Sequence, residues 1–183
     1  MVNKGPDSAG AVDVAREAGM RCVRGNHEAK LFKIAHTPPS QWNARARSLA
    51  ENLGPRLREI SEEVHRWPLW LDLGNVLVVH AGLQPGVARL EDMDPSVLMA
   101  VRTWDGVGLD MYTSNHPPWF DLVSWPVPVV FGHWALKGLV DRPDVKGLDS
   151  GCVYGRELTG WCPEEDRFYR VRARREYVPM TKD

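Results

Sequence analysis

The sequence predicts an α/β fold in which short apolar strands alternate with amphipathic helices. Strands are expected over residues 75–79 and 127–131, because residues 76–79 and 127–131 are continuous apolar runs, a pattern typical of strands that are buried on both faces. Segments with apolar side chains three and four residues apart lie before and between these runs and indicate helices. This alternation is typical of layered α/β architectures.

The first elements are predicted from their end signals. Residues 8–18 are expected to form a helix, because Asp7 or Ser8 can cap its start and Gly19 favours its end. A short strand is expected over residues 20–24. The chain therefore begins with one helix and one strand of the α/β pattern.

Three further helices are predicted downstream. Residues 40–53 carry apolar side chains at spacings of 4, 3 and 4, and residues 57–67 carry them at 3, 4 and 3. A short helix is expected to begin at Asp94 and Pro95, since Asp caps a helix and Pro favours its first position.

The last part of the chain is predicted to be β-structure. Strands are expected over residues 152–154, 158–161 and 168–173, which are separated by Gly, Pro and charged residues. A basic run alternates with apolar residues there, as on the solvated face of an edge strand. A contact with a phosphate polymer or with nucleic acid is the alternative interpretation of this run, whose members are Arg167, Arg170, Arg172, Arg174 and Arg175.

Composition limits the class of protein. The chain has 183 residues, and 23 Lys and Arg against 24 Asp and Glu give a net charge of -1. This balance argues against a dedicated nucleic-acid-binding protein. The three cysteines form no CxxC pair, which favours neither a disulfide framework nor a cysteine zinc site. We expect one domain over residues 1–183 in the cytoplasm, without a membrane segment in this chain.

Polar residues follow three of the predicted strands. The first strand runs into residues 25–28 (GNHE), the next into residues 80–82 (HAG) and the third into residues 132–133 (GH). Ligand-binding loops of α/β folds gather at strand ends, so the histidines of these segments are expected to converge on one cleft. A single His beside Gly would more often be a surface or structural residue.

These positions could hold a metal ion. The amide of Asn26 and the imidazoles of His80 and His133 are suitable ligands for one borderline divalent ion, Zn, Mn or Fe. The sequence separations are 54 and 53 residues, so the fold must assemble such a site. His27 would stand beside it as a proton donor. Purely structural histidines remain the alternative.

The ordered motifs resemble those of the calcineurin-like metallophosphoesterases. They are residues 25–28, 79–83, 131–133 and 148–155, followed by Leu158-Thr159. The nearest branch is that of the bacterial diadenosine tetraphosphatases and the serine/threonine protein phosphatases. The resemblance implies a β-sandwich flanked by helices and a two-metal hydrolytic centre. It places Asn26, His80 and His133 on one ion and the general acid on His27.

The sequence departs from the family at its start. The family's Asp-x-His and Gly-Asp motifs, which ligate the second ion, have no counterpart upstream of Asn26. Asn3 stands where the family commonly has the Asp that supports the general acid, and Lys4 where it has a phosphate-binding Arg. Arg102 resembles another family Arg that contacts phosphate, although a surface role is equally compatible. We therefore expect an N-terminally truncated domain that lacks the first strand or strands and holds at most one ion.

The resemblance implies a metal-dependent phosphoesterase. Its substrate would be phosphorylated: a phosphoprotein, a dinucleoside polyphosphate or polyphosphate, attacked by a hydroxide activated by two metal ions. The alternative is a catalytically impaired remnant that binds phosphate or a partner, because the upstream metal ligands are absent. A third hypothesis is a nucleic-acid module that uses the arginine-rich tail. Of the three, it is the one not expected, so we expect no nucleic-acid partner.

Overall fold

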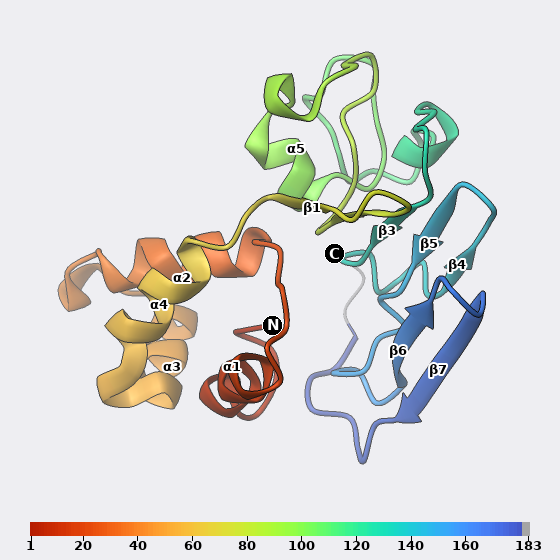
Figure 1. Cartoon of the computed structure of the whole chain (residues 1–183). Helices are drawn as coiled ribbons and strands as arrows, with labels where there is room; N and C mark the ends of the chain where they lie inside the picture. Colours follow the sequence, from red (N-terminus) through yellow and green to blue (C-terminus); the bar gives the residue numbers. More distant parts are fainter. Residues whose placement is uncertain (181–183) are drawn as a thin grey trace. The chain divides into compact units, whose positions relative to one another are not determined.

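The computed structural model describes residues 1–180 and divides the chain into two compact units, Met1–Pro68 and Leu69–Asp183. Figure 1 shows helices in the first unit and all of the strands in the second. The predicted α/β class is confirmed, since the chain combines α-helices with a mixed parallel and antiparallel sheet. The expectation of one domain over the whole chain stays a prediction.

The first unit is helical. Its first and fourth helices begin where the sequence predicts, whereas the third begins at Ala44, later than the predicted residue 40. Side chains cap the first and third: Asp7 accepts a hydrogen bond from the Gly10 amide (2.7 Å) and Asn43 from the Ala46 amide (2.9 Å). Their apolar faces meet in one core that includes fully buried Val12. The helices are α1 (Ser8–Glu17), α2 (Asn26–Ala35), α3 (Ala44–Leu53) and α4 (Leu57–His65), with short 3-10 turns at Pro39–Gln41 and Gly54–Arg56.

The strand predicted over residues 20–24 is wrong. This segment has no strand assignment, and at its end the Arg24 amide donates to the carbonyl of Pro68 (2.8 Å). A strand needs a neighbouring strand to complete its hydrogen bonds, and the described elements of the first unit are all helical. Helix α2, which the sequence analysis did not predict, begins directly after this segment.

The second unit contains a five-stranded sheet with the order β1-β2-β3-β5-β4. The central pairs β2/β3 and β3/β5 are parallel, and the outer pairs are antiparallel. The two predicted apolar strands are confirmed in shorter form as β2 and β3, and the ends of both are at most 3% exposed. The strands are β1 (Trp70–Asp72), β2 (Leu77–Val79), β3 (Val129–Phe131), β4 (Val140–Asp141) and β5 (Val145–Gly147).

One α-helix belongs to the second unit. Helix α5 (Pro95–Ala100) starts as predicted, with the Asp94 carboxylate accepting from the Ser96 amide (2.7 Å). Two 3-10 turns, Leu90–Asp92 and Trp119–Asp121, pack into the same core as α5 and the central strands. The core of this unit therefore lies around β2 and β3, the strands that lead into the histidine motifs.

A two-stranded hairpin, β6 (Glu157–Cys162) and β7 (Arg167–Arg172), confirms two of the three predicted C-terminal strands. The third, over residues 152–154, is wrong in the structure, because the segment forms tight turns with isolated bridges. The carbonyl of Gly151, just before this segment, accepts from the Tyr154 amide (2.9 Å), and this hydrogen bond bends the backbone away from an extended path.

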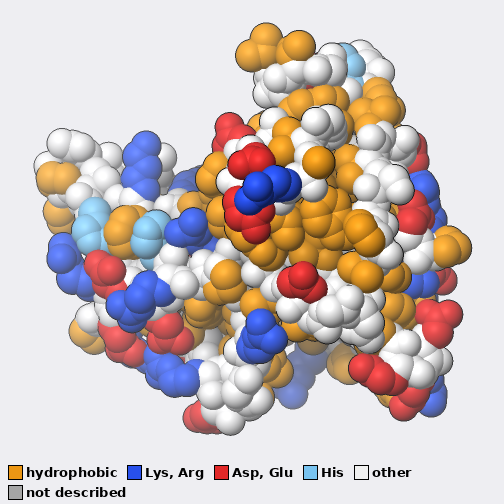
Figure 2. All heavy atoms as spheres, turned by 45° about the horizontal axis from the view of Figure 1, so that its top comes forward, with side chains coloured by type: hydrophobic (Ala, Val, Ile, Leu, Met, Phe, Trp, Pro, Cys, Tyr) orange, Lys and Arg blue, Asp and Glu red, His pale blue; other side chains and the backbone are white. Residues whose placement is uncertain are grey.

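Hydrophobic side chains are spread over the face shown in Figure 2, with charged groups among them. In the second unit the most exposed are Val107 (72%) and Leu109 (92%), in a loop after α5. In the part of the chain that the structure describes, no helix is both long and apolar enough to cross a membrane.

Candidate functional site

His80 and His133 lie side by side at one end of the sheet. His80 follows the last residue of β2, and His133 follows β3 after Gly132, and these strands are parallel neighbours. The Gly132 amide donates to the carbonyl of His80 (2.9 Å), which ties the two strand ends together. The imidazole centroids are 5.3 Å apart. The fold thus brings together two side chains that are 53 positions apart in sequence.

This separation fits two ligands of one ion. An ion about 2.1 Å from one nitrogen of each ring would lie about 3.2 Å from each ring centroid. Centroids 5.3 Å apart would then subtend an angle of about 110° at the ion, close to the tetrahedral value. The donor set and its spacing therefore suit a borderline divalent metal.

The turn after His80 is held by neighbouring elements. The Ala81 amide donates to the carbonyl of Leu98 in α5 (3.0 Å). The indole of Trp119, 1% exposed, lies directly against Gly82, where an added Cβ would come within 2.4 Å of Nε1. Glycine is therefore required at position 82 by the close approach of the indole.

Asp149 lies at the same end of the sheet, and the sequence analysis gave it no role. It follows β5, where the Leu148 amide donates to the carbonyl of Phe131 (2.8 Å), so it stands beside the end of β3. A Cβ added to Gly132 would be 4.0 Å from the Cβ of Asp149. Its place in the motif of residues 148–155 was the available signal, but β5 had not been predicted.

In the first unit, Asn26 and His27 open helix α2. The buried carboxylate of Glu28 accepts from the amides of Gly25 (3.0 Å) and Val2 (3.3 Å). It thereby fixes the turn that precedes Asn26. This is the local reason why the sequence GNHE starts a helix here, with a side chain reaching back to the cap residue.

His27 has a side-chain partner in the N-terminal segment. Asn3 Nδ2 donates to Nδ1 of His27 (2.6 Å), and with Nδ1 as acceptor the proton of the neutral ring is on Nε2. Burial lowers the pKa of His27 to about 4, Glu28 opposes that shift, and the positive charge of Lys4 adds to it. The imidazole is thus neutral at pH 7 in the metal-free protein.

Arg102 follows helix α5. Its amide donates to the carbonyl of Met111 (2.9 Å) and its carbonyl accepts from the Trp119 amide (3.1 Å). Its Cζ lies 5.8 Å from the centroid of the Tyr112 ring. Its Nε is buried, with no hydrogen-bond acceptor among residues 1–180.

The predicted site residues therefore fall into two groups. The structure brings Asn3 and His27 into contact in the first unit, and His80 and His133 in the second. Among the described residues, no group of three or more His, Cys, Asp or Glu side chains has a metal-binding arrangement. The predicted ligand set is compatible with this finding, since it has two imidazoles and takes its third donor from the amide of Asn26.

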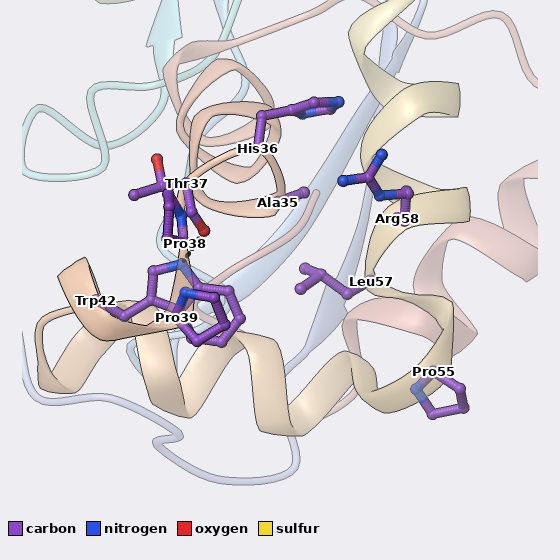
Figure 3. A pocket seen from close by; sticks show the side chains of 9 residues that line it. All are labelled: Ala35, His36, Thr37, Pro38, Pro39, Trp42, Pro55, Leu57 and Arg58. Carbon is purple, nitrogen blue, oxygen red and sulfur yellow. Dashed lines mark hydrogen bonds between the residues drawn. The ribbon is translucent and has the colours of Figure 1, made fainter.

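A pocket of about 490 Å³ lies in the first unit (Figure 3). One wall is Trp42, whose indole donates to the carbonyls of Ile34 (3.1 Å) and Thr37 (2.9 Å). None of the predicted site residues lines it. Its lining is Ala35, His36, Thr37, Pro38, Pro39, Trp42, Pro55, Leu57 and Arg58.

Comparisons with known proteins identify relatives over most of the chain, although no family model matches. A symmetrical bis(5'-nucleosyl)-tetraphosphatase of Aromatoleum aromaticum is 28% identical over an alignment 230 positions long, which covers 94% of this chain and 84% of that protein. A protein of the same name from Ralstonia nicotianae is 41% identical over 76 residues, which are 40% of this chain and 26% of that protein.

A solved structure extends the similarity to the fold. It is described as a "putative diadenosine tetraphosphatase", and its TM-score to this chain is 0.78. The sequences are 31% identical, and the match covers 94% of this chain and 77% of that one. The chain belongs to the calcineurin-like metallophosphoesterase superfamily. Members of this superfamily are hydrolases that use divalent metal ions.

As a metallophosphoesterase, the chain presents its histidine motifs on the elements described above. His80 and His133 end two adjacent parallel strands, and His27 lies in the first turn of α2. The sheet registers β2 against β3 by pairing Leu77 with Val129, and this register sets the two ring positions.

Proposed function

We propose that this metallophosphoesterase hydrolyses phosphoanhydride bonds, with a dinucleoside polyphosphate as its substrate. The observation that supports this proposal most is the pair His80 and His133, whose ring centroids are 5.3 Å apart just after the ends of two adjacent parallel strands. The names of the relatives support the substrate class, because proteins that align with nearly the whole chain are named for bis(5'-nucleosyl)-tetraphosphate.

Asn26, His80 and His133 are the proposed ligands of one divalent ion. The two imidazoles and the amide oxygen suit Mn, Zn or Fe. A divalent ion there would neutralise phosphoryl charge and lower the pKa of bound water. The set contains no carboxylate, so we expect weaker binding than in a site with acidic ligands.

His27 is the proposed proton donor. Water attacks a phosphorus atom and releases a proton to solvent, the bond to the bridging oxygen breaks, and the oxygen of the departing nucleotide takes a proton from Nε2 of the protonated His27 ring, which is left neutral. Asn3 supports this role by holding the ring at Nδ1; when the ring is protonated, the side-chain amide of Asn3 would turn so that its Oδ1 accepts from Nδ1. The negative charge of a polyphosphate beside the ring would raise the pKa of His27 from its value of about 4, which favours the protonated donor.

Lys4 and Arg102 are the proposed phosphate-binding groups. Lys4 contributes positive charge at His27, as the lowered pKa of that residue indicates. Arg102 carries a guanidinium whose buried Nε has no acceptor in the described residues. Both cations would hold phosphate oxygens while the anhydride is cleaved.

A second candidate is a protein that binds the phosphorylated ligand without turnover. The observation that favours it is the absence, within residues 1–180, of a cluster of three or more His, Cys, Asp or Glu side chains arranged for a metal. A two-metal centre uses such groups as ligands of its second ion. Without the second ion the attacking water is less activated. Turnover measurements separate the two candidates.

The test is to incubate the chain with diadenosine tetraphosphate and Mn²⁺ and to separate the products by ion-exchange chromatography. We expect metal-dependent release of ADP, the product of symmetrical cleavage, at a slow rate because only one ion is held. His80→Ala should abolish this release, while His116→Ala, which alters a surface imidazole paired with Asp110, should not. A phosphopeptide and p-nitrophenyl phosphate in parallel reactions test the other phosphoesters. Tight binding without ADP release would establish the second candidate.

A further inference from the structure

Two buried N–H groups of the second unit lack hydrogen-bond acceptors. They are Nε1 of Trp119 and Nε of Arg102, and neither has a partner within the described residues. Buried polar groups in proteins nearly always have a partner, so an exception needs an explanation. Both groups are donors without any capacity to accept, which restricts a partner to an acceptor such as a phosphate oxygen.

The two residues are held next to each other. The Trp119 amide donates to the carbonyl of Arg102 (3.1 Å), and the Trp104 amide donates to the carbonyl of Pro117 (3.0 Å). An antiparallel bridge pairs Thr103 with Pro118. The segments that carry Arg102 and Trp119 therefore run side by side.

Trp119 also reaches the candidate metal site. Its indole nitrogen lies against Gly82, two residues after His80 in the same turn. Its ring packs edge-on against Phe131, which ends β3 two residues before His133 (centroids 5.3 Å apart). Trp119 is therefore in contact with both segments that position the histidine pair.

We propose that Trp119 Nε1 donates a hydrogen bond to a phosphate oxygen of the ligand bound at the end of β2 and β3, beside the Arg102 already proposed to bind phosphate. This inference rests on the proposed function and adds a residue for which the sequence motifs predict no role. A phenyl ring would pack in the same place without burying an unsatisfied N–H group. The indole nitrogen is thus explained by an incoming acceptor.

Access to the pair involves the loop after α5. The Tyr112 ring lies over the guanidinium of Arg102, 5.8 Å from Cζ, and Tyr112 is 53% exposed. The two nitrogens are out of contact with water, so the ligand must displace a covering side chain. Tyr112 is such a group for Arg102, because it stands on an exposed loop and lies over the guanidinium.

The test is a titration of the ¹⁵N-labelled chain, loaded with Zn²⁺, with inorganic phosphate, followed by ¹H–¹⁵N correlation spectra. Trp119→Phe and Arg102→Lys assign the two side-chain N–H signals by their disappearance. We expect both signals to shift downfield in a saturable manner in the wild-type chain. The Trp42 indole serves as the internal control, since it already donates to two carbonyls and should not move.

The second arm measures phosphate and Zn²⁺ affinity by calorimetry. Trp119→Phe should weaken phosphate binding at least fivefold and leave Zn²⁺ affinity unchanged. An unshifted Trp119 signal at saturating phosphate, or an unchanged phosphate affinity in a folded Trp119→Phe variant, overturns the inference. If Zn²⁺ does not bind His80 and His133 while phosphate still shifts the Trp119 signal, the proposed function fails and this inference stands.

Discussion

The amide nitrogen of Asn3 lies 2.6 Å from Nδ1 of His27, although 24 residues separate the two in sequence. The group next to Nδ1 is thus an uncharged amide. A carboxylate at the same position would stabilise the imidazolium. Burial is the main cause of the low pKa of His27, about 4, and the amide provides no charge to offset it.

The low pKa of His27 predicts a pH dependence of stability in the metal-free chain. The folded state holds His27 neutral down to about pH 4, whereas the unfolded ring titrates near its model value of 6.5. The unfolded state therefore binds more protons between these values, and the free energy of unfolding should fall as pH decreases from 6.5 to 4. Urea unfolding in EDTA, compared between wild type and His27→Gln, measures this contribution. Equal slopes in the two proteins would contradict it.

Replacing Asn3 by Asp should raise the pKa of His27. A carboxylate at hydrogen-bonding distance favours the imidazolium, and shifts of about 1 unit or more are usual for such pairs. NMR titration of the ring signals in the metal-free variant measures the change. Asn3→Leu is the matched control, which removes the amide without adding charge and should raise the pKa less than Asn3→Asp does. An unchanged pKa in Asn3→Asp would show that the two side chains do not interact in solution.

Gly82→Ala should destabilise the second unit. The new Cβ would lie 2.4 Å from the Trp119 indole nitrogen, and overpacking of this kind costs about 1 to 3 kcal/mol. Gly160→Ala is the control, because no atom lies within 4 Å of the added Cβ, and its effect should be below about 1 kcal/mol. Chemical denaturation of both variants gives the two values. Equal stability of the two variants would contradict the contact between Gly82 and Trp119.

The histidine pair was predictable from the sequence because apolar runs buried on both faces constrain their neighbours. β2 and β3 are such apolar runs, with buried end residues and half-buried central residues (Val78 and Val130), and their parallel pairing places the residues that follow them at one end of the sheet. The same reasoning failed for residues 20–24. A short run has the same pattern whether or not a partner strand is present, and only the fold shows that none is paired there.

Other features could not be predicted, because their residue types do not indicate them. In β5 the central side chain is Lys146, 6% exposed, a residue type that the apolar pattern excludes. Its ammonium group contacts Asp141 (2.6 Å) and lies over the Trp161 ring (5.2 Å to the centroid), which allows its burial. For Trp119 the difficulty is different. A large apolar ring favours burial, but only the three-dimensional structure shows that its indole nitrogen has no hydrogen-bond partner.

Removal of one imidazole should remove the metal. His80→Ala is expected to reduce Zn²⁺ binding at least tenfold, because each imidazole is one of three proposed ligands, and His116→Ala should retain it. In the wild-type chain, affinity should also fall as the pH is lowered, because protons compete with the metal for the imidazole nitrogens. Calorimetric titrations at two pH values provide both measurements. If the Zn²⁺ affinity is the same in His80→Ala as in the wild-type chain, His80 is not a ligand.

The central claim is that Asn26, His80 and His133 hold a single divalent ion. Crystals grown with Zn²⁺, measured on both sides of the zinc absorption edge, test it most directly through the anomalous difference map. The account predicts one peak about 2.1 Å from a nitrogen of His80, a nitrogen of His133 and the amide oxygen of Asn26. A map in which the zinc peak contacts neither histidine, or contacts the histidines without Asn26, would contradict it.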